Sequence, residues 1–182
     1  MDNFKPSKED MLDAVNRTVP DLIALDLDVL FCGINPGLYS GATRRHFAKP
    51  GNRFWKVLHQ AGFTQRQLQP WEEDELVAGG CGIICFCKRT TARADELTRE
   101  EIVEGGREVV ARVRKYKPRI LAVLGIGAYK TAYEKKEAKL GLQDEKIGDT
   151  RIWLLPNPSG LNAHYQLPAL VELFKELRSA AN

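Results

Sequence analysis

Four short apolar runs, rich in branched side chains, recur along the chain. Each is bounded by charged or turn residues, which is typical of β-strands covered on both faces. We therefore expect buried strands at residues 28–34, 82–86, 119–125 and 151–156.

Helical periodicity occupies much of the sequence between these runs. Residues 52–61 place their apolar side chains on one face, and residues 166–180 close the chain as an amphipathic helix. Thr98 and Glu101 have the spacing of a capping box, which predicts a long helix that ends before Pro118.

Strands that alternate with helices predict the α/β class, here a three-layer α/β/α sandwich around a central, mostly parallel sheet. We expect a single domain over residues 19–182 and an appended extension over 1–18, with a helix at 8–17. The charged segment 134–150 is interpreted as an exposed connection. Two adjacent glycines at 105–106 would weaken the long helix, so we expect close packing there.

Length and composition limit the class of protein. The chain has 182 residues, 43% hydrophobic and 28% charged, enough for one sizeable core but not comfortably for two. No secretion signal and no apolar run of membrane-spanning length is visible, so we expect a cytoplasmic protein without a membrane partner. We also expect a monomer. A net charge of +3 does not by itself identify a nucleic-acid partner.

Basic residues gather in two stretches that follow predicted strands, at 44–56 and 88–93. Such runs are usually solvated faces. Placed just after strands, they are also candidates for a surface that contacts phosphates.

The four cysteines allow two interpretations. Cys81, Cys85 and Cys87 lie close together and Cys32 falls in another strand, so an iron–sulfur or zinc site is conceivable. However, the spacing is not a paired C-x-x-C pattern, and the residues lie in apolar runs where a thiol behaves as a small hydrophobe. We favour buried thiols and expect neither a metal nor another cofactor.

Two strand ends carry matching loops, GINPG at 33–37 and PNPSGL at 156–161. Proline keeps the preceding asparagine extended, and the glycines allow a ligand to approach the backbone. One such loop is an ordinary turn. Two of them at the carboxyl ends of strands, where ligands bind in parallel sheets, predict a functional site.

These segments resemble a known family. GINPG, HFAKPGNRFWKVLHQAGFT and LPNPSGL, with RTT at 89–91 and EGGR at 104–107, are similar to the mismatch-specific uracil-DNA glycosylases and their thymine-DNA glycosylase relatives, in the uracil-DNA glycosylase superfamily. The resemblance runs from about Val19 to the C-terminus. It implies that the protein excises uracil, or thymine, opposite guanine in duplex DNA by hydrolysing the base–deoxyribose bond. The base must first be flipped out of the stack.

The resemblance also implies roles for individual residues. Phe47 would stack on the flipped base, Asn157 would lie near the departing base, and Asn35 would position the attacking water. An amide cannot accept a proton at neutral pH, so a carboxylate would have to assist. Asp95 is our candidate for that group, although a solvated acid ahead of the Thr98 cap is an equally good interpretation.

The remaining expected contacts form two sets. The loop 158–166 would enter the DNA with Leu161 as an apolar wedge. The expected DNA contacts are Ser159, Gly160, Leu161, Asn162, His164 and Arg89, and the expected base-binding residues are Gly33, Ile34, Pro36, Gly37, Ser40, Phe47 and Lys49.

Other classes of protein compete with a glycosylase. A redox module would require the cysteines to converge, and a nucleotide-binding domain would rest on a lone G-x-G at 125–127, which is a weak signal. The alternative that fits the same residues is a catalytically silent protein that binds damaged DNA.

Overall fold

The computed structural model describes residues 4–182, and its centre is a five-stranded sheet in the order β2-β1-β3-β5-β4. Four strands are parallel, and the edge strand β4 runs antiparallel to β5. The strands are β1 (Val29–Gly33), β2 (Cys81–Cys85), β3 (Ile120–Leu124), β4 (Gly141–Ile147) and β5 (Thr150–Leu155). All four predicted strands are confirmed, each shifted by one residue at its ends.

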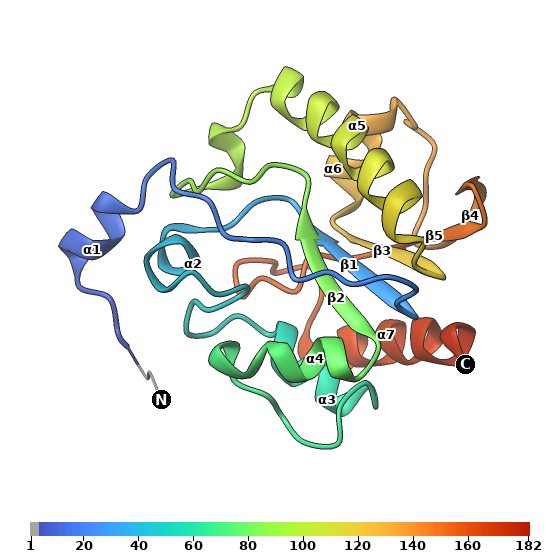
Figure 1. Cartoon of the computed structure of the whole chain (residues 1–182), viewed down its shortest axis with the longest axis horizontal. Coiled ribbons are helices and arrows are strands. Elements are labelled where there is room, and N and C mark those ends of the chain that lie inside the picture. The colour runs from blue at the N-terminus through green and yellow to red at the C-terminus, as the bar shows by residue number, and fades with distance from the viewer. Residues whose placement is uncertain (1–3) are drawn as a thin grey trace.

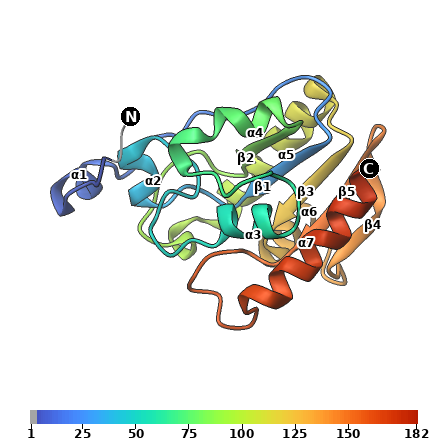
Figure 2. The ribbon, with the colours of Figure 1, turned by 90° about the horizontal axis from the view of Figure 1, so that it is seen from below.

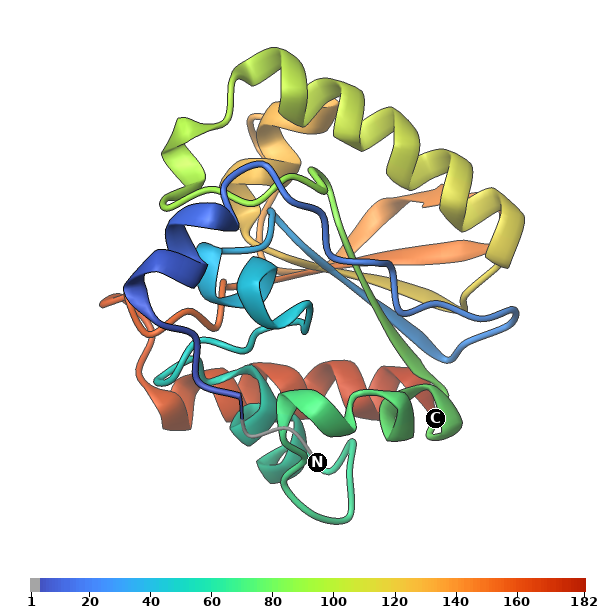
Figure 3. The ribbon, with the colours of Figure 1, turned by 60° about the vertical axis from the view of Figure 1, so that its left-hand side comes forward.

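Helices cover both faces of the sheet, so the predicted three-layer α/β/α architecture is confirmed (Figures 1 and 3). One face is covered by α3 (Phe54–Gln60), α4 (Asp74–Ala78) and α7 (Leu167–Ala181), which lie in front of the sheet in Figure 2. The opposite face is covered by α5 (Arg99–Tyr116) and α6 (Ile126–Tyr133).

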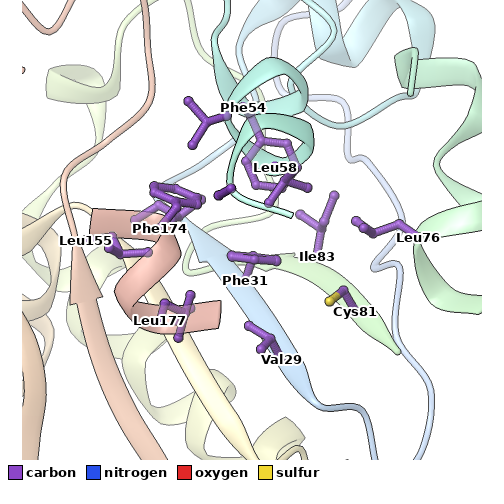
Figure 4. Packing of buried hydrophobic residues seen from close by; sticks show 14 of the residues in the cluster. Val29, Phe31, Phe54, Leu58, Leu76, Cys81, Ile83, Leu155, Phe174 and Leu177 are labelled. Atoms are coloured by element: carbon purple, nitrogen blue, oxygen red, sulfur yellow. The ribbon is translucent and has the colours of Figure 1, made fainter. Parts of the chain in front are cut away.

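Strand β1 shows why short apolar runs form the centre of this fold. Val29 and Phe31 point into the core under α3 and α7, whereas Leu30 and Cys32 point into the core under α5 and α6. All four are fully buried. Figure 4 shows Phe31 near Phe54 and Phe174 in the core under α3 and α7. The ring centroids of Phe31 and Phe54 are 5.4 Å apart.

The long helix α5 begins as predicted, with Thr98 and Glu101 forming a reciprocal capping box. The close packing expected at its glycines is also confirmed. A Cβ atom on Gly105 would collide with the carbonyl oxygen of Phe86, and one on Gly106 would approach α6 to 3.0 Å.

Two predicted segments need correction. Residues 134–150 are more than an exposed connection, because they include β4, whose sequence GLQDEKI is mostly polar and exposed. Charged side chains suit an edge strand, since they discourage pairing with other chains, but they conceal the apolar signal of a strand. The predicted helix at 8–17 is shorter, with α1 spanning Lys8–Asp13 behind a Ser7 cap.

The residues after α1 pair with the segment that follows β2. The backbone amide of Asn16 donates to the carbonyl of Thr90 at 3.1 Å, and the amide of Thr90 donates to the carbonyl of Arg17 at 2.8 Å. The proposed boundary between an extension and a domain at residue 19 stays a prediction. Within residues 4–182, no helix has the length and apolar character needed to cross a lipid bilayer.

Candidate active site

A cavity of about 390 Å³ opens at the carboxyl edge of the sheet, between the loops that follow β1, β2 and β5. Both Asn-Pro loops contribute to its wall, so the two matching sequences converge. The predicted site residues that line it are Gly33, Ile34, Asn35, Pro36, Gly37, Ser40, Phe47, Lys49, Asp95, Asn157, Ser159 and Leu161. Gly160, Asn162, His164 and Arg89 are not among its lining residues.

Hydrogen bonds fix the orientation of the Asn35 amide. Its nitrogen donates to the carbonyl oxygen of Arg89 at 3.1 Å and to Thr91 Oγ1 at 2.7 Å. The carbonyl of Arg89 can only accept, and the Thr91 hydroxyl itself donates to the carbonyl of Arg93, so the nitrogen must face these partners. Oδ1 of Asn35 has no partner within residues 4–182. Every buried side-chain oxygen or nitrogen in these residues has a hydrogen-bond partner. The unpartnered Oδ1 of Asn35 is therefore not buried and is accessible as an acceptor.

The Asn157 amide is held through its oxygen, whereas the Asn35 amide is held through its nitrogen. Its Oδ1 accepts a hydrogen bond from the backbone amide of Ser159 at 2.9 Å, which can only donate. The amide nitrogen therefore faces away from Ser159 and has no acceptor in the described part of the chain. Asn157 thus has a free donor and Asn35 a free acceptor, and both residues line the cavity.

Phe47 forms a flat wall of the cavity. Its ring stacks on Phe54 with 4.0 Å between centroids and 24° between planes, and a Cβ on Gly33 would lie 3.5 Å from its edge. Its φ of 50° is in the left-handed region, which is uncommon for a bulky residue. The surrounding structure therefore has to hold this backbone in place.

The neighbouring His46 supplies that restraint. Its backbone amide donates to Glu73 Oε2 at 3.0 Å, its carbonyl accepts from Trp55 Nε1 at 3.2 Å, and its ring Nε2 donates to the carbonyl of Pro20 at 2.9 Å. Burial lowers the pKa of His46, and the nearby carboxylate of Glu73 opposes that change. A neutral ring that donates to a carbonyl is consistent with this buried setting.

Asp95 lies at the mouth of the cavity in a short 3₁₀ turn, Ala94–Glu96. Its carboxylate pairs with Arg93, and 62% of its side chain is exposed. A carboxylate does reach the cavity, but it is solvated and paired. Its role as an assisting base stays a prediction.

Arg89 is held by partners within the protein. Its guanidinium makes a two-pronged ion pair with Glu101, including Nη2 to Oε2 at 3.0 Å, and also donates to the carbonyl of Glu96. The hydrogen bonds from Arg89 and from the Thr98 backbone lower the pKa of Glu101 to about 2. Arg89 therefore supports the start of α5, and its contact with DNA stays a prediction.

All four cysteines are buried free thiols, as interpreted from the sequence. Burial raises the pKa of Cys85 to about 12 and that of Cys87 to about 11. Within residues 4–182, no group of three or more His, Cys, Asp or Glu side chains is arranged to hold a metal ion.

Sequence reasoning missed two residues that shape this site. Thr91 is almost fully buried and orients Asn35, although its place after β2 at the same sheet edge was a usable signal. Arg53 donates hydrogen bonds to the backbone of the loop after β5, and nothing in the sequence joins positions so far apart.

The fold is that of an α/β protein, and its cavity opens at the carboxyl edge of a mostly parallel sheet, which is where proteins of this architecture bind their ligands. Residues 20–179 match the family model of the uracil DNA glycosylase superfamily. The match covers most of the chain, so the chain belongs to this superfamily of hydrolytic enzymes that act on DNA.

Proposed function

We propose that this protein is a monofunctional glycosylase that excises uracil opposite guanine from duplex DNA. The observation that carries the proposal is the pair of asparagine amides, one with a free acceptor and one with a free donor, which line one cavity together with Phe47.

Phe47, Asn157 and Asn35 would each have a separate role in the proposed reaction. A flipped pyrimidine would lie against Phe47, whose other face is covered by Phe54. As the bond to deoxyribose breaks, the base leaves with the electron pair, and the amide nitrogen of Asn157 would stabilise its negative charge.

Water replaces the base at the sugar carbon. Oδ1 of Asn35 would accept a hydrogen bond from this water and hold it in line, but an amide cannot take the proton that the water must lose. Asp95 is the carboxylate at the cavity that would accept it, directly or through a second water, after release from Arg93.

The loop 158–166 would enter the duplex. Leu161 is 84% exposed and lines the mouth of the cavity, as expected of a wedge that fills the space left by a flipped base. Asn162 and His164 lie on the same loop and would face the opposing guanine.

One observation favours the alternative, a silent protein that binds damaged DNA. The only acid proposed to assist is solvated and paired with Arg93. Without a base to accept the proton, the same cavity would bind an extruded pyrimidine and leave the bond intact.

A panel of labelled oligonucleotides separates the two functions. Uracil or thymine opposite guanine or adenine, and uracil in a single strand, are incubated with excess protein and then treated with alkali. We expect alkali-labile sites, most rapidly with uracil opposite guanine, and no strand cleavage before alkali. Tight binding of the mispair without release of free base would establish the silent binder instead.

A further inference from the structure

The guanidinium of Arg53 binds the backbone of the loop that carries Leu161. It donates to four carbonyl oxygens of this loop: Nε to Pro158 at 3.2 Å, Nη1 to Tyr165 at 2.6 Å, and Nη2 to Ser159 at 2.6 Å and Asn162 at 3.2 Å. Four of the five N–H donors of one side chain thus join both ends and the middle of a single loop.

We propose that Arg53 is the positioning residue that holds loop 158–166 in its DNA-entering shape before any DNA is bound. This inference rests on the proposed function, because it assigns Arg53 a part in recognising duplex DNA. Arg53 is not a catalytic residue, since it is absent from the lining of the cavity.

The chemistry of the partners suits a loop that must approach phosphates. All the acceptors of Arg53 are neutral carbonyls, and within residues 4–182 it forms no ion pair, so its positive charge is not cancelled. The four carbonyl dipoles point inward to this charge. Because these oxygens face a positive charge, they would repel the phosphates of a bound duplex less than free carbonyls would.

Arg53 also connects this loop to Phe47, the side chain expected to stack on the base. It directly precedes α3, whose first residue Phe54 lies under Phe47, and its own backbone amide donates to Pro158 O at 3.2 Å. A second contact seats the loop on the turn before α3, because a Cβ on Gly160 would come within 2.8 Å of the carbonyl oxygen of Gly51.

Leu161 needs such support because it is 84% exposed and has little packing of its own. A loop already ordered in the free protein loses less conformational freedom on binding. Loss of Arg53 should therefore weaken the engagement of duplex DNA, with a smaller effect on bond cleavage once the base is in the cavity.

The experiment compares Arg53→Lys with wild type. Lysine keeps the charge but lacks the planar fork that reaches several carbonyls. Single-turnover excision of uracil opposite guanine is measured over a range of enzyme concentrations, which yields the half-saturating concentration and the maximal rate. Arg151→Lys is the matched control, because Arg151 lies at the start of β5, the opposite end of this strand from the loop, and donates to the carbonyl of Ala180.

We expect Arg53→Lys to raise the half-saturating concentration about tenfold with the maximal rate changed less than about threefold, and the control to match wild type. Combined with Leu161→Ala, Arg53→Lys should add little further loss, because both changes act through one loop. An unchanged half-saturating concentration, or a full additional loss in the double variant, would overturn the inference.

Two further measurements test whether the loop 158–166 is held in place in the free protein. Hydrogen exchange of the free protein should accelerate at the backbone amides of residues 159–165 in Arg53→Lys and stay unchanged elsewhere, whether or not the protein excises any base; no change there overturns the inference. If Arg53→Lys does not fold, Gly160→Ala should raise the half-saturating concentration in the same way, and a wild-type value would count against the inference. Wild-type protein that releases no uracil refutes the proposed function instead.

Discussion

Asn35 and Asn157 line one cavity and leave opposite ends of their amide groups without a protein partner, although they follow the first and the last strands of the chain. Asn35 is held through its nitrogen by Thr91, and Asn157 is held through its oxygen by the Ser159 amide. Because each partner can act only as acceptor or only as donor at that bond, neither amide can rotate by 180° without losing a hydrogen bond. The site is therefore preorganised for one acceptor and one donor.

Thr91→Val should slow excision by about tenfold, because the amide of Asn35 loses its shortest hydrogen bond and is free to flip. Thr91→Ser keeps the hydroxyl and should retain most of the rate. Single-turnover release of uracil measures both variants. A wild-type rate in Thr91→Val would show that the hydroxyl is not what orients Asn35, and a loss in Thr91→Ser as large as in Thr91→Val would contradict the assignment to the hydroxyl alone.

Asp95→Asn should slow excision by about 100-fold if the carboxylate takes the proton of the attacking water. The matched variant is Glu96→Gln, which alters the neighbouring acid in the same turn. Both are measured with uracil opposite guanine under single-turnover conditions. If Asp95→Asn keeps the full rate while Asn35→Ala abolishes it, Asp95 is only a solvated acid.

Gly105→Ala should lower the free energy of unfolding by about 1–3 kcal/mol, because the added methyl group collides with the carbonyl of Phe86. Gly127→Ala, in α6, meets nothing within 4 Å and should be neutral or stabilising by about 0.5–1 kcal/mol. Urea unfolding of wild type and the two variants measures these changes in the free energy of unfolding. A Gly105→Ala protein as stable as wild type would contradict the packing described for α5.

Glu101→Gln should destabilise the protein at neutral pH by about 0.5–1 kcal/mol, since the partly exposed pair with Arg89 loses its charge. Glutamine retains the capping box, so the ion pair alone is tested. The folded state lowers the pKa of Glu101 from 4.5 to about 2, so its contribution is present above pH 4.5 and is lost as the pH falls toward 2.

Unfolding at a series of pH values checks this dependence. The difference between wild type and Glu101→Gln should be constant above about pH 5.5 and shrink below pH 4.5. A difference that persists undiminished at pH 2 would contradict the assignment to the ion pair.

The sequence predicted those parts of the fold whose signal is local. Strand β1 is apolar on both faces because both faces are covered, and α5 begins at a capping box that four neighbouring residues define. β4 was missed because its exposed edge position favours charged side chains, which resemble those of a loop. The short helices α2 (Leu38–Thr43) and α4 contain too few turns to show periodicity.

The candidate site was predictable to the extent that it follows from strand ends. The Asn-Pro loops lie at the carboxyl edge by the general rule for parallel sheets, so their convergence could be expected. The direction of each amide depends on Thr91 and Ser159, and the support of the Leu161 loop depends on Arg53, more than 100 positions earlier. Such partners are brought together only by the complete fold.

The most direct test of the central claim measures cleavage and binding on the same variants. Single-turnover release of uracil from a guanine mispair is compared for wild type, Asn35→Ala and Asn157→Ala, together with Kd for a duplex carrying a non-cleavable 2′-fluoro analogue of deoxyuridine. We predict that each variant loses about 100-fold or more in rate while Kd changes less than about fivefold. The account would be contradicted by wild-type protein that binds the analogue duplex but releases no uracil from the cleavable mispair. Variants that release uracil at the wild-type rate would also contradict it.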